Sequence, residues 1–196
     1  MLESLLVPTL IVALAEIGDK TQLLALLLAA RFRKPVPIIL GMVAATLANH
    51  LVAGAVGAWV AGLFSPAALR WCLAAAFAAV AVWTLIPDKL DDDESARLKR
   101  FGPFLTTLVA FFLAEMGDKT QVATVMLAAQ YPHFLLVVAG TTLGMLAANV
   151  PVVLAGNFAA ERLPLTLIRR LAALAFAVLA LYAAYEALMI GAPPSA

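Results

Sequence analysis

Residues 15–22 read AEIGDKTQ, and residues 114–121, which lie 99 positions further along the chain, read AEMGDKTQ. The same offset pairs Gly41 with Gly140 and Arg70 with Arg169 without any gap. A match that keeps one register over the whole chain indicates an internal duplication. The two copies of this charged stretch each lie inside a long apolar segment, and this placement decides the fold.

Composition indicates a helical membrane protein. Of the 196 residues, 64% are hydrophobic and 13% are charged, whereas soluble domains are about 45–50% apolar and about 25% charged. A helix that spans a membrane needs about 20 apolar residues. Prolines and charged residues divide the chain into six segments of that kind: 4–30, 36–63, 67–87, 103–131, 134–160 and 165–190. We therefore predict an all-α membrane protein with six transmembrane helices.

The repeat divides these six helices into two sets of three. We expect a first repeat over residues 1–87, a charged cytoplasmic loop over 88–102 and a second repeat over 103–196, all within one membrane domain. Because three is an odd number, the second repeat enters the membrane from the opposite side. This is an inverted-topology repeat, which is typical of secondary transporters with a site near the membrane midplane.

Loop charges predict the orientation. Ten lysines and arginines lie in the first, third and fifth loops or at their edges: Arg31, Arg33, Lys34, Lys89, Arg97, Lys99, Arg100, Arg162, Arg169 and Arg170. The opposite side has Arg70 alone. The positive-inside rule then places these loops in the cytoplasm and both termini outside it. The first apolar segment lacks the charge pattern of a signal peptide, so we expect it to remain in the mature protein.

Several classes of function are disfavoured. A net charge of +1 gives no basic face for nucleic acid, so none is expected as a partner. Cys72 is the only cysteine, which excludes an intrachain disulfide and a thiolate metal site. The sequence has no Walker, GxSxG or HExxH motif, and we predict that the protein is not an enzyme.

Four acidic residues lie deep in apolar segments: Glu16, Asp19, Glu115 and Asp118. A charge at the bilayer centre costs about 2.5–3.5 kcal/mol, and such residues usually line a site or pathway. Within each motif, the spacing of three places both acids on one helical face. A purely structural interpretation pairs Glu16 with Lys20, and Glu115 with Lys119, at i and i+4.

That pairing leaves a surplus of two negative charges, since each motif has two acids and one lysine. One divalent cation or two protons would neutralise the surplus, which is the requirement of a cation/proton antiporter. Carboxylates are hard ligands that suit Mn²⁺, Ca²⁺ or Mg²⁺. Six further residues are expected to support the site or the proton coupling: Lys20, Thr21, Gln22, Lys119, Thr120 and Gln121.

Three further features have two interpretations each. Gly18 and Gly117 either interrupt their helices, turning backbone carbonyls toward an ion, or allow close helix packing. His50, whose repeat counterpart is Asn149, fits interhelical hydrogen bonding better than a proton relay. Glu186 is either an access group for ions or an interfacial residue.

The motif E-x-G-D-[KR]-[ST] occurs twice, as Glu16–Thr21 and Glu115–Thr120. In this the chain resembles a family of small cation/proton antiporters that includes eukaryotic Golgi manganese/calcium transporters and bacterial manganese exporters of the MneA type. The resemblance covers nearly the whole chain. It implies that the Glu and Asp of each motif bind the transported cation and exchange protons. It also implies a multi-pass protein of the bacterial cytoplasmic (inner) membrane, since the chain has no long N-terminal extension.

The resulting hypothesis is a secondary transporter that exchanges a divalent cation for protons and exports the metal. Mn²⁺ is the favoured cation, and Ca²⁺ is the second candidate. The metal ion and protons are substrates, the bilayer is the environment, and no permanently bound cofactor is expected. Whether the protein forms a homo-oligomer is a question that the sequence leaves open. Two alternatives remain: a passive divalent-cation channel, and an exporter of small organic cations or amino acids.

Overall fold

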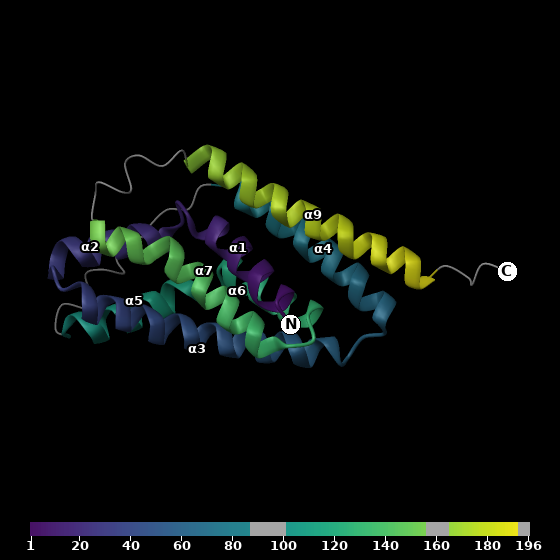
Figure 1. Ribbon diagram of the computed structural model, residues 1–196, viewed down its shortest axis with the longest axis horizontal. Coiled ribbons are helices and arrows are strands. Elements are labelled where there is room, and N and C mark those ends of the chain that lie inside the picture. Colours follow the sequence, from purple (N-terminus) through teal and green to yellow (C-terminus); the bar gives the residue numbers. More distant parts are fainter. Residues whose placement is uncertain (87–100, 156–164, 192–196) are drawn as a thin grey trace.

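The computed structural model describes residues 1–86, 101–155 and 165–191, and these residues are entirely helical or in short turns (Figure 1). Eight helices lie within the described residues. They are α1 (Glu3–Glu16), α2 (Lys20–Phe32), α3 (Pro35–Ala61), α4 (Pro66–Thr84), α5 (Pro103–Glu115), α6 (Lys119–Gln130), α7 (Phe134–Ala155) and α9 (Leu165–Gly191). The all-α prediction is confirmed for this part of the chain.

Four of these helices, α3, α4, α7 and α9, are long and apolar enough to cross a membrane. Their bounds follow the predicted segments closely. The first and fourth apolar segments differ from the prediction, because each is two shorter helices, α1–α2 and α5–α6, rather than one. An apolar segment therefore corresponds to one continuous helix in four of the six cases.

Both interruptions fall on the repeated motif and have the same backbone path. Gly18 has a φ of +82° and Gly117 a φ of +79°, a left-handed conformation that glycine adopts without a steric penalty. The residues that follow, Asp19 and Asp118, are extended, each with φ −80° and ψ 165°. Of the two interpretations of these glycines, the structure supports interrupted helices.

Close packing between helices repeats with the same 99-residue offset. A side chain at Gly140 would meet the carbonyl of Leu5, and a side chain at Gly41 would meet that of Phe104, the counterpart of Leu5. Glycine thus lets α7 approach α1, and α3 approach α5, at backbone distance. Gly41 and Gly140 are therefore packing positions between helices.

Two pairs of repeat counterparts contact each other directly. The Thr46 hydroxyl donates to the Met145 sulfur at 2.7 Å, and the rings of Phe77 and Phe176 stack with centroids 6.4 Å apart. The members of each pair are 99 positions apart. A residue can touch its own counterpart only near the axis that relates two copies, so these pairs mark where the two halves of the chain meet.

The outer surface is apolar. Helices α4 and α9 run side by side along one edge of the molecule (Figure 1). On α9, Leu174, Val178 and Leu181 are exposed, as is Val82 on α4. A continuous apolar exterior is unfavourable in water and suits the hydrocarbon of a bilayer. The buried polar side chains lie instead on the inner helices α1–α3 and α5–α7, apart from Thr84 on α4.

Residues 88–100 of the predicted cytoplasmic loop, and Arg162, lie outside the described residues. Most of the predicted division at 88–102 and five of the ten loop charges used for orientation belong to this part of the chain. The repeat boundaries and the position of the termini therefore stay predictions.

We predict that Gly117→Ala lowers the apparent melting temperature of the purified protein. A left-handed φ costs a non-glycine residue about 1–2 kcal/mol. A Cβ at Gly117 would meet no atom within 4 Å, so backbone strain alone should act. Gly18→Ala should cost more, because its Cβ would also lie 3.0 Å from Leu165 Cδ2.

Gly102→Ala is the matched control, since Gly102 has an ordinary φ of −65° and equally open surroundings. Thermal unfolding in detergent measures all three variants. Equal melting temperatures for Gly117→Ala and Gly102→Ala would show that the helix interruption does not require glycine.

Candidate metal centre

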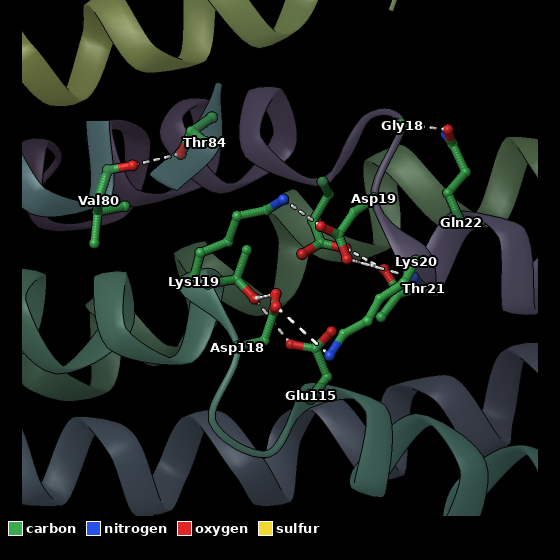
Figure 2. Close-up of polar contacts among 12 residues, drawn as sticks. Gly18, Asp19, Lys20, Thr21, Gln22, Val80, Thr84, Glu115, Asp118 and Lys119 are labelled. Atoms are coloured by element: carbon green, nitrogen blue, oxygen red, sulfur yellow. Dashed lines mark hydrogen bonds and ion pairs between the residues drawn. The ribbon is translucent and has the colours of Figure 1, made fainter. Parts of the chain in front are cut away.

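The two helix interruptions bring acidic side chains of both motifs together, as Figure 2 shows for Asp19, Glu115 and Asp118. Glu16 is the last residue of α1, and Asp19 precedes α2 as its N-cap. Glu115 and Asp118 have the same positions at the end of α5 and the start of α6. All four are buried. The prediction that Glu and Asp of one motif share a helical face is wrong, because the chain turns between them.

The lysines pair across the two motifs. Lys119 Nζ lies 2.5 Å from Asp19 Oδ1, and Lys20 Nζ lies 3.6 Å from Asp118 Oδ1. These two ion pairs are repeat counterparts of each other and both are drawn in Figure 2. The structural interpretation paired Lys20 with Glu16 and Lys119 with Glu115. It is wrong, because each lysine pairs with the aspartate of the other motif. A side chain on an interrupted helix no longer faces the position four residues before it.

The threonines link the two acids within each motif. The Thr21 hydroxyl lies 2.6 Å from Glu16 Oε2 and 3.5 Å from Asp19 Oδ2. In the second motif, the Thr120 hydroxyl lies 2.9 Å from Glu115 Oε2 and 3.4 Å from Asp118 Oδ2. A hydroxyl has one proton to donate, so each threonine favours the shorter contact, with the glutamate, and keeps both carboxylates close.

The glutamines support the turns rather than the carboxylates. Gln22 Oε1 accepts the Gly18 N–H at 2.9 Å, and Gln121 Oε1 accepts the Gly117 N–H at 2.7 Å. Each glutamine also donates to the neighbouring helix, Gln22 to the Ala148 carbonyl at 3.1 Å and Gln121 to Asn49 Oδ1 at 3.5 Å. The glutamines thus tie the turns that carry the acids to α7 and α3.

One site residue was missed from the sequence. Asn149 on α7 is fully buried and donates from Nδ2 to Glu16 Oε2 at 3.2 Å. In the sequence it stood out only as the counterpart of His50. The sequence signal for such a residue is an amide side chain deep inside an apolar segment. Buried amides need polar partners, and the four carboxylates lie at a similar depth in their own segments.

The carboxylates of Glu16, Asp19 and Asp118 offer oxygens that all lie within 4.8 Å of one another. Oxygens bind Ca²⁺ at about 2.3–2.6 Å, so two oxygens on opposite sides of such an ion stand about twice that distance apart. The cluster therefore has the dimensions and the hard oxygen donors that divalent cations require. Glu16 Oε1 and Glu115 Oε1 are buried without a hydrogen-bond partner among the described residues, so these oxygens are available as ligands.

Other residues singled out in the sequence lie elsewhere. Glu186 forms an ion pair with Arg70 at 2.9 Å, beside a cavity of about 450 Å³ that Glu3 and Tyr131 also line. Glu186 is therefore more than an isolated interfacial charge. His50 is buried, and neither ring nitrogen has a hydrogen-bond partner among the described residues. The predicted interhelical hydrogen bond of His50 is wrong.

An apolar exterior, helices long enough to span a bilayer and enclosed charged groups define a multi-pass membrane protein of the kind that transports ions. Comparison with known proteins agrees with this class. The family model "Divalent cation/proton antiporter GDT1" matches residues 4–92 and 103–190. The chain belongs to the GDT1 family, which is a family of transporters rather than enzymes.

A protein of Vibrio cholerae serotype O1 named "Putative manganese exporter" is 56% identical over 175 residues, covering 89% of this chain and 86% of that protein. No solved structure matches the chain. The resemblance seen in the sequence is thus confirmed at the level of the family.

We predict that Lys119→Gln destabilises the protein more than Lys20→Gln. The side chains of Lys119 and Asp19 are 2% and 0% exposed, and leaving one member of such a pair alone costs about 3–5 kcal/mol. The Lys20 side chain is 25% exposed, and pairs open to solvent contribute about 0–1 kcal/mol. Apparent melting temperatures in detergent compare the two variants.

The double variant Asp19→Asn with Lys119→Gln removes both charges of the buried pair. It should recover part of the stability lost in Lys119→Gln, because no unpaired charge remains. If the double variant were less stable than Lys119→Gln by the full cost of Asp19→Asn alone, the two side chains would not be coupled.

Proposed function

We propose that this protein is a secondary transporter that exchanges one divalent cation, Mn²⁺ by preference, for protons across the bacterial cytoplasmic membrane. The observation that carries the proposal is the group of four buried carboxylates, two of which pair with lysines of the opposite motif. Glu16, Asp19, Glu115 and Asp118 bind the cation. The two cross-motif ion pairs account for two negative charges, and two remain for the substrate.

The charge balance sets the mechanism. A buried charge of −2 is neutralised by one divalent cation or by two protons, so the site alternates between these states. Metal binding requires deprotonated ligands and therefore releases protons. Carboxyl groups this close exchange their protons in coupled steps rather than singly. With protons more abundant outside the cell, inward proton movement drives the metal out of the cytoplasm.

Lys20 and Lys119 act as fixed counter-charges in this scheme. Each holds an aspartate of the opposite motif, so the lysines link the two halves without binding the cation themselves. The threonines orient the glutamates, and the glutamines hold the turns. A surplus of two negative charges is matched by one divalent ion but not by one ammonium group, which disfavours organic cations as substrates.

We further propose that the fold is an inverted repeat of six spans, α1–α2, α3, α4 and then α5–α6, α7, α9. The equivalent contacts 99 residues apart support this arrangement, and both termini then lie outside the cytoplasm. Interrupted helices at the repeat interface are a common site architecture in secondary transporters. A charge cluster confined to one depth fits alternating access better than a channel, which needs a continuous wet path.

We predict that Glu16→Gln and Glu115→Gln each abolish or greatly reduce exchange. Each change removes one negative charge and one proton site while nearly preserving the shape of the side chain. The measurement is Mn²⁺ uptake into inverted membrane vesicles with an acidic interior. Wild-type protein should accumulate Mn²⁺ against its gradient, and a dissipated proton gradient should stop accumulation.

Glu3→Gln is the matched control, since Glu3 is an exposed carboxylate at the start of α1. It should transport as the wild type does. Full Mn²⁺ uptake by both site variants would contradict the four-carboxylate site. Flux that follows the metal gradient alone would indicate a channel, and loss of metal flux through competition by a basic amino acid would indicate an organic-cation exporter.

A further inference from the structure

We propose that the helix pair α4–α9 is the moving part of the transporter, and that the structure is the state closed on the side of the chain termini. The pair now covers α1 and α6, and in the alternate state it covers α2 and α5 instead. The inference rests on the proposed function, because it says how the same site reaches each side of the membrane.

The four short helices leave the carboxylates in two directions. Helix α1 ends at Glu16, and α6 begins directly after Asp118. Their far ends, at Glu3 and Gln130, line the same cavity of about 450 Å³. Glu186, near the end of α9, lines it too, so α1 and α6 extend from the site toward the chain termini. Helices α2 and α5 lie toward the opposite end of the molecule (Figure 1).

The pair α4–α9 packs on the first two of these helices. Helix α9 packs against α1, and α4 packs against α6, whereas among the described residues neither α2 nor α5 packs comparably on α4 or α9. One buried apolar cluster therefore joins α1, α4, α6 and α9, through Ile11, Phe77, Leu127 and Phe176 among others. The described members of the second cluster come from α2, α3, α5 and α7. The contacts of α4 and α9 thus break the equivalence of the two repeats.

The first apolar cluster separates the carboxylates from the cavity. Ala15, directly before Glu16, belongs to the cluster, and so does Leu179, which lines the cavity. Between the helices, the fully buried rings of Phe77 and Phe176 stack on each other. A dry apolar constriction is a barrier to ions. The route from the site to the side of the termini is therefore closed in this structure.

The surfaces of α2 and α6 show the same asymmetry at single residues. One face of α6 is covered by the apolar cluster and its lysine is buried; this face consists of Lys119, Val122, Met126 and Ala129. The counterparts 99 positions earlier form one face of α2: Lys20, Leu23, Leu27 and Ala30. Leu27 is 38% exposed, against 4% for Met126. The Lys20 side chain is 25% exposed, against 2% for Lys119. A whole face of α2 is thus uncovered where the same face of α6 is covered.

The uncovered face of α2 leads to the site and begins with a charge. Lys20 pairs with Asp118 at 3.6 Å. A charge in hydrocarbon is costly, so a partly exposed lysine at this depth faces water rather than lipid. The face is therefore one wall of an aqueous route to the carboxylates from the side of α2. With both termini outside the cytoplasm, as proposed above, this is the side from which an exporter takes up its metal.

Helix α9 is placed to cover this face of α2 in the alternate state. It is the counterpart of α4, which covers α6. Leu165, its first residue, already lies at the α1–α2 turn, since a Cβ on Gly18 would be 3.0 Å from Leu165 Cδ2. The ion pair of Arg70 with Glu186, at 2.9 Å, joins α4 to α9. The two helices therefore shift together, away from α1 and α6 and onto α2 and α5.

The test measures how fast single cysteines of the purified full-length protein react with a charged methanethiosulfonate reagent. Cys72→Ala removes the native cysteine, and Leu27→Cys or Met126→Cys then places one thiol at equivalent positions of α2 and α6. Because only the thiolate reacts and it requires water, we expect Leu27→Cys to react about tenfold faster than Met126→Cys without metal. Leu181→Cys is the control for lipid-facing exposure, since Leu181 is 71% exposed on α9, and it should react slowly.

Saturating Mn²⁺ should change both reactivities in opposite directions. The metal neutralises the carboxylates, so the apolar pair can then cover either side of the site. We expect Met126→Cys to react faster and Leu27→Cys to react more slowly than without metal. Reaction of Leu27→Cys from the cytoplasmic face of inverted vesicles, with an impermeant reagent, checks the side on which the route opens.

A bulkier residue in the apolar cluster should act in the same way without metal. Ala180→Phe adds a ring to α9 at a buried position of that cluster and overpacks the closed side. It should raise the reactivity of Met126→Cys and lower that of Leu27→Cys. A rise at Met126→Cys with no change at Leu27→Cys would mean local loosening and would overturn the inference.

Failure of this inference is distinguishable from failure of the proposed function. If the Cys72→Ala protein exchanges Mn²⁺ for protons while Leu27→Cys reacts no faster than Leu181→Cys, the face of α2 is not an aqueous route. If exchange occurs and Mn²⁺ leaves both reactivities unchanged, α4–α9 is not the moving part, and the carboxylate site stands. If the protein with its native cysteine does not exchange Mn²⁺ for protons, the proposed function itself is wrong.

Discussion

The structure depends on one electrostatic constraint, which is that four carboxylates cannot stay ionised in an apolar interior unless positive charge reaches them. Two lysines supply half of that charge, and each reaches the aspartate of the opposite motif. The interrupted helices follow from the same requirement. A continuous helix would direct Lys20 back toward Glu16, whereas the turn at Gly18 lets Asp19 face Lys119. Because each aspartate is paired with the lysine of the other motif, neither ion pair can form within one motif alone.

The closeness of the helices serves this arrangement. Glycines at equivalent positions bring α7 onto α1 and α3 onto α5, and these helices carry Asn149 and Asn49 to the two turns. The apolar pair α4 and α9 lies on the outside with its exposed leucines and valines. The molecule thus has polar groups enclosed by inner helices and an exterior suited to lipid. A divalent cation at the centre would give Glu16 Oε1 and Glu115 Oε1 the partner that they lack among the described residues.

Much of this could be predicted from the sequence because composition and repeats report on the bilayer directly. The apolar segments predicted the starts of the four long helices within one residue, and the duplicated motif identified the four buried acids. Side-chain partners could not be predicted, since the i and i+4 rule assumes an unbroken helix. A left-handed Gly18 invalidates that assumption, and the sequence alone allowed it to be a packing residue. The contact of Asn149 with Glu16 is a tertiary contact between residues 133 positions apart, which no local pattern reports.

The central claim is that both motifs form one site that holds either a divalent cation or protons. Calorimetric titration of the purified protein with Mn²⁺, in buffers of different ionisation enthalpy, measures the number of ions bound and the protons released together. The account predicts one Mn²⁺ per chain, with a net release of protons that grows as the starting pH is lowered until protons prevent binding. Two independent Mn²⁺ ions per chain, or binding without proton release at every pH, would contradict it.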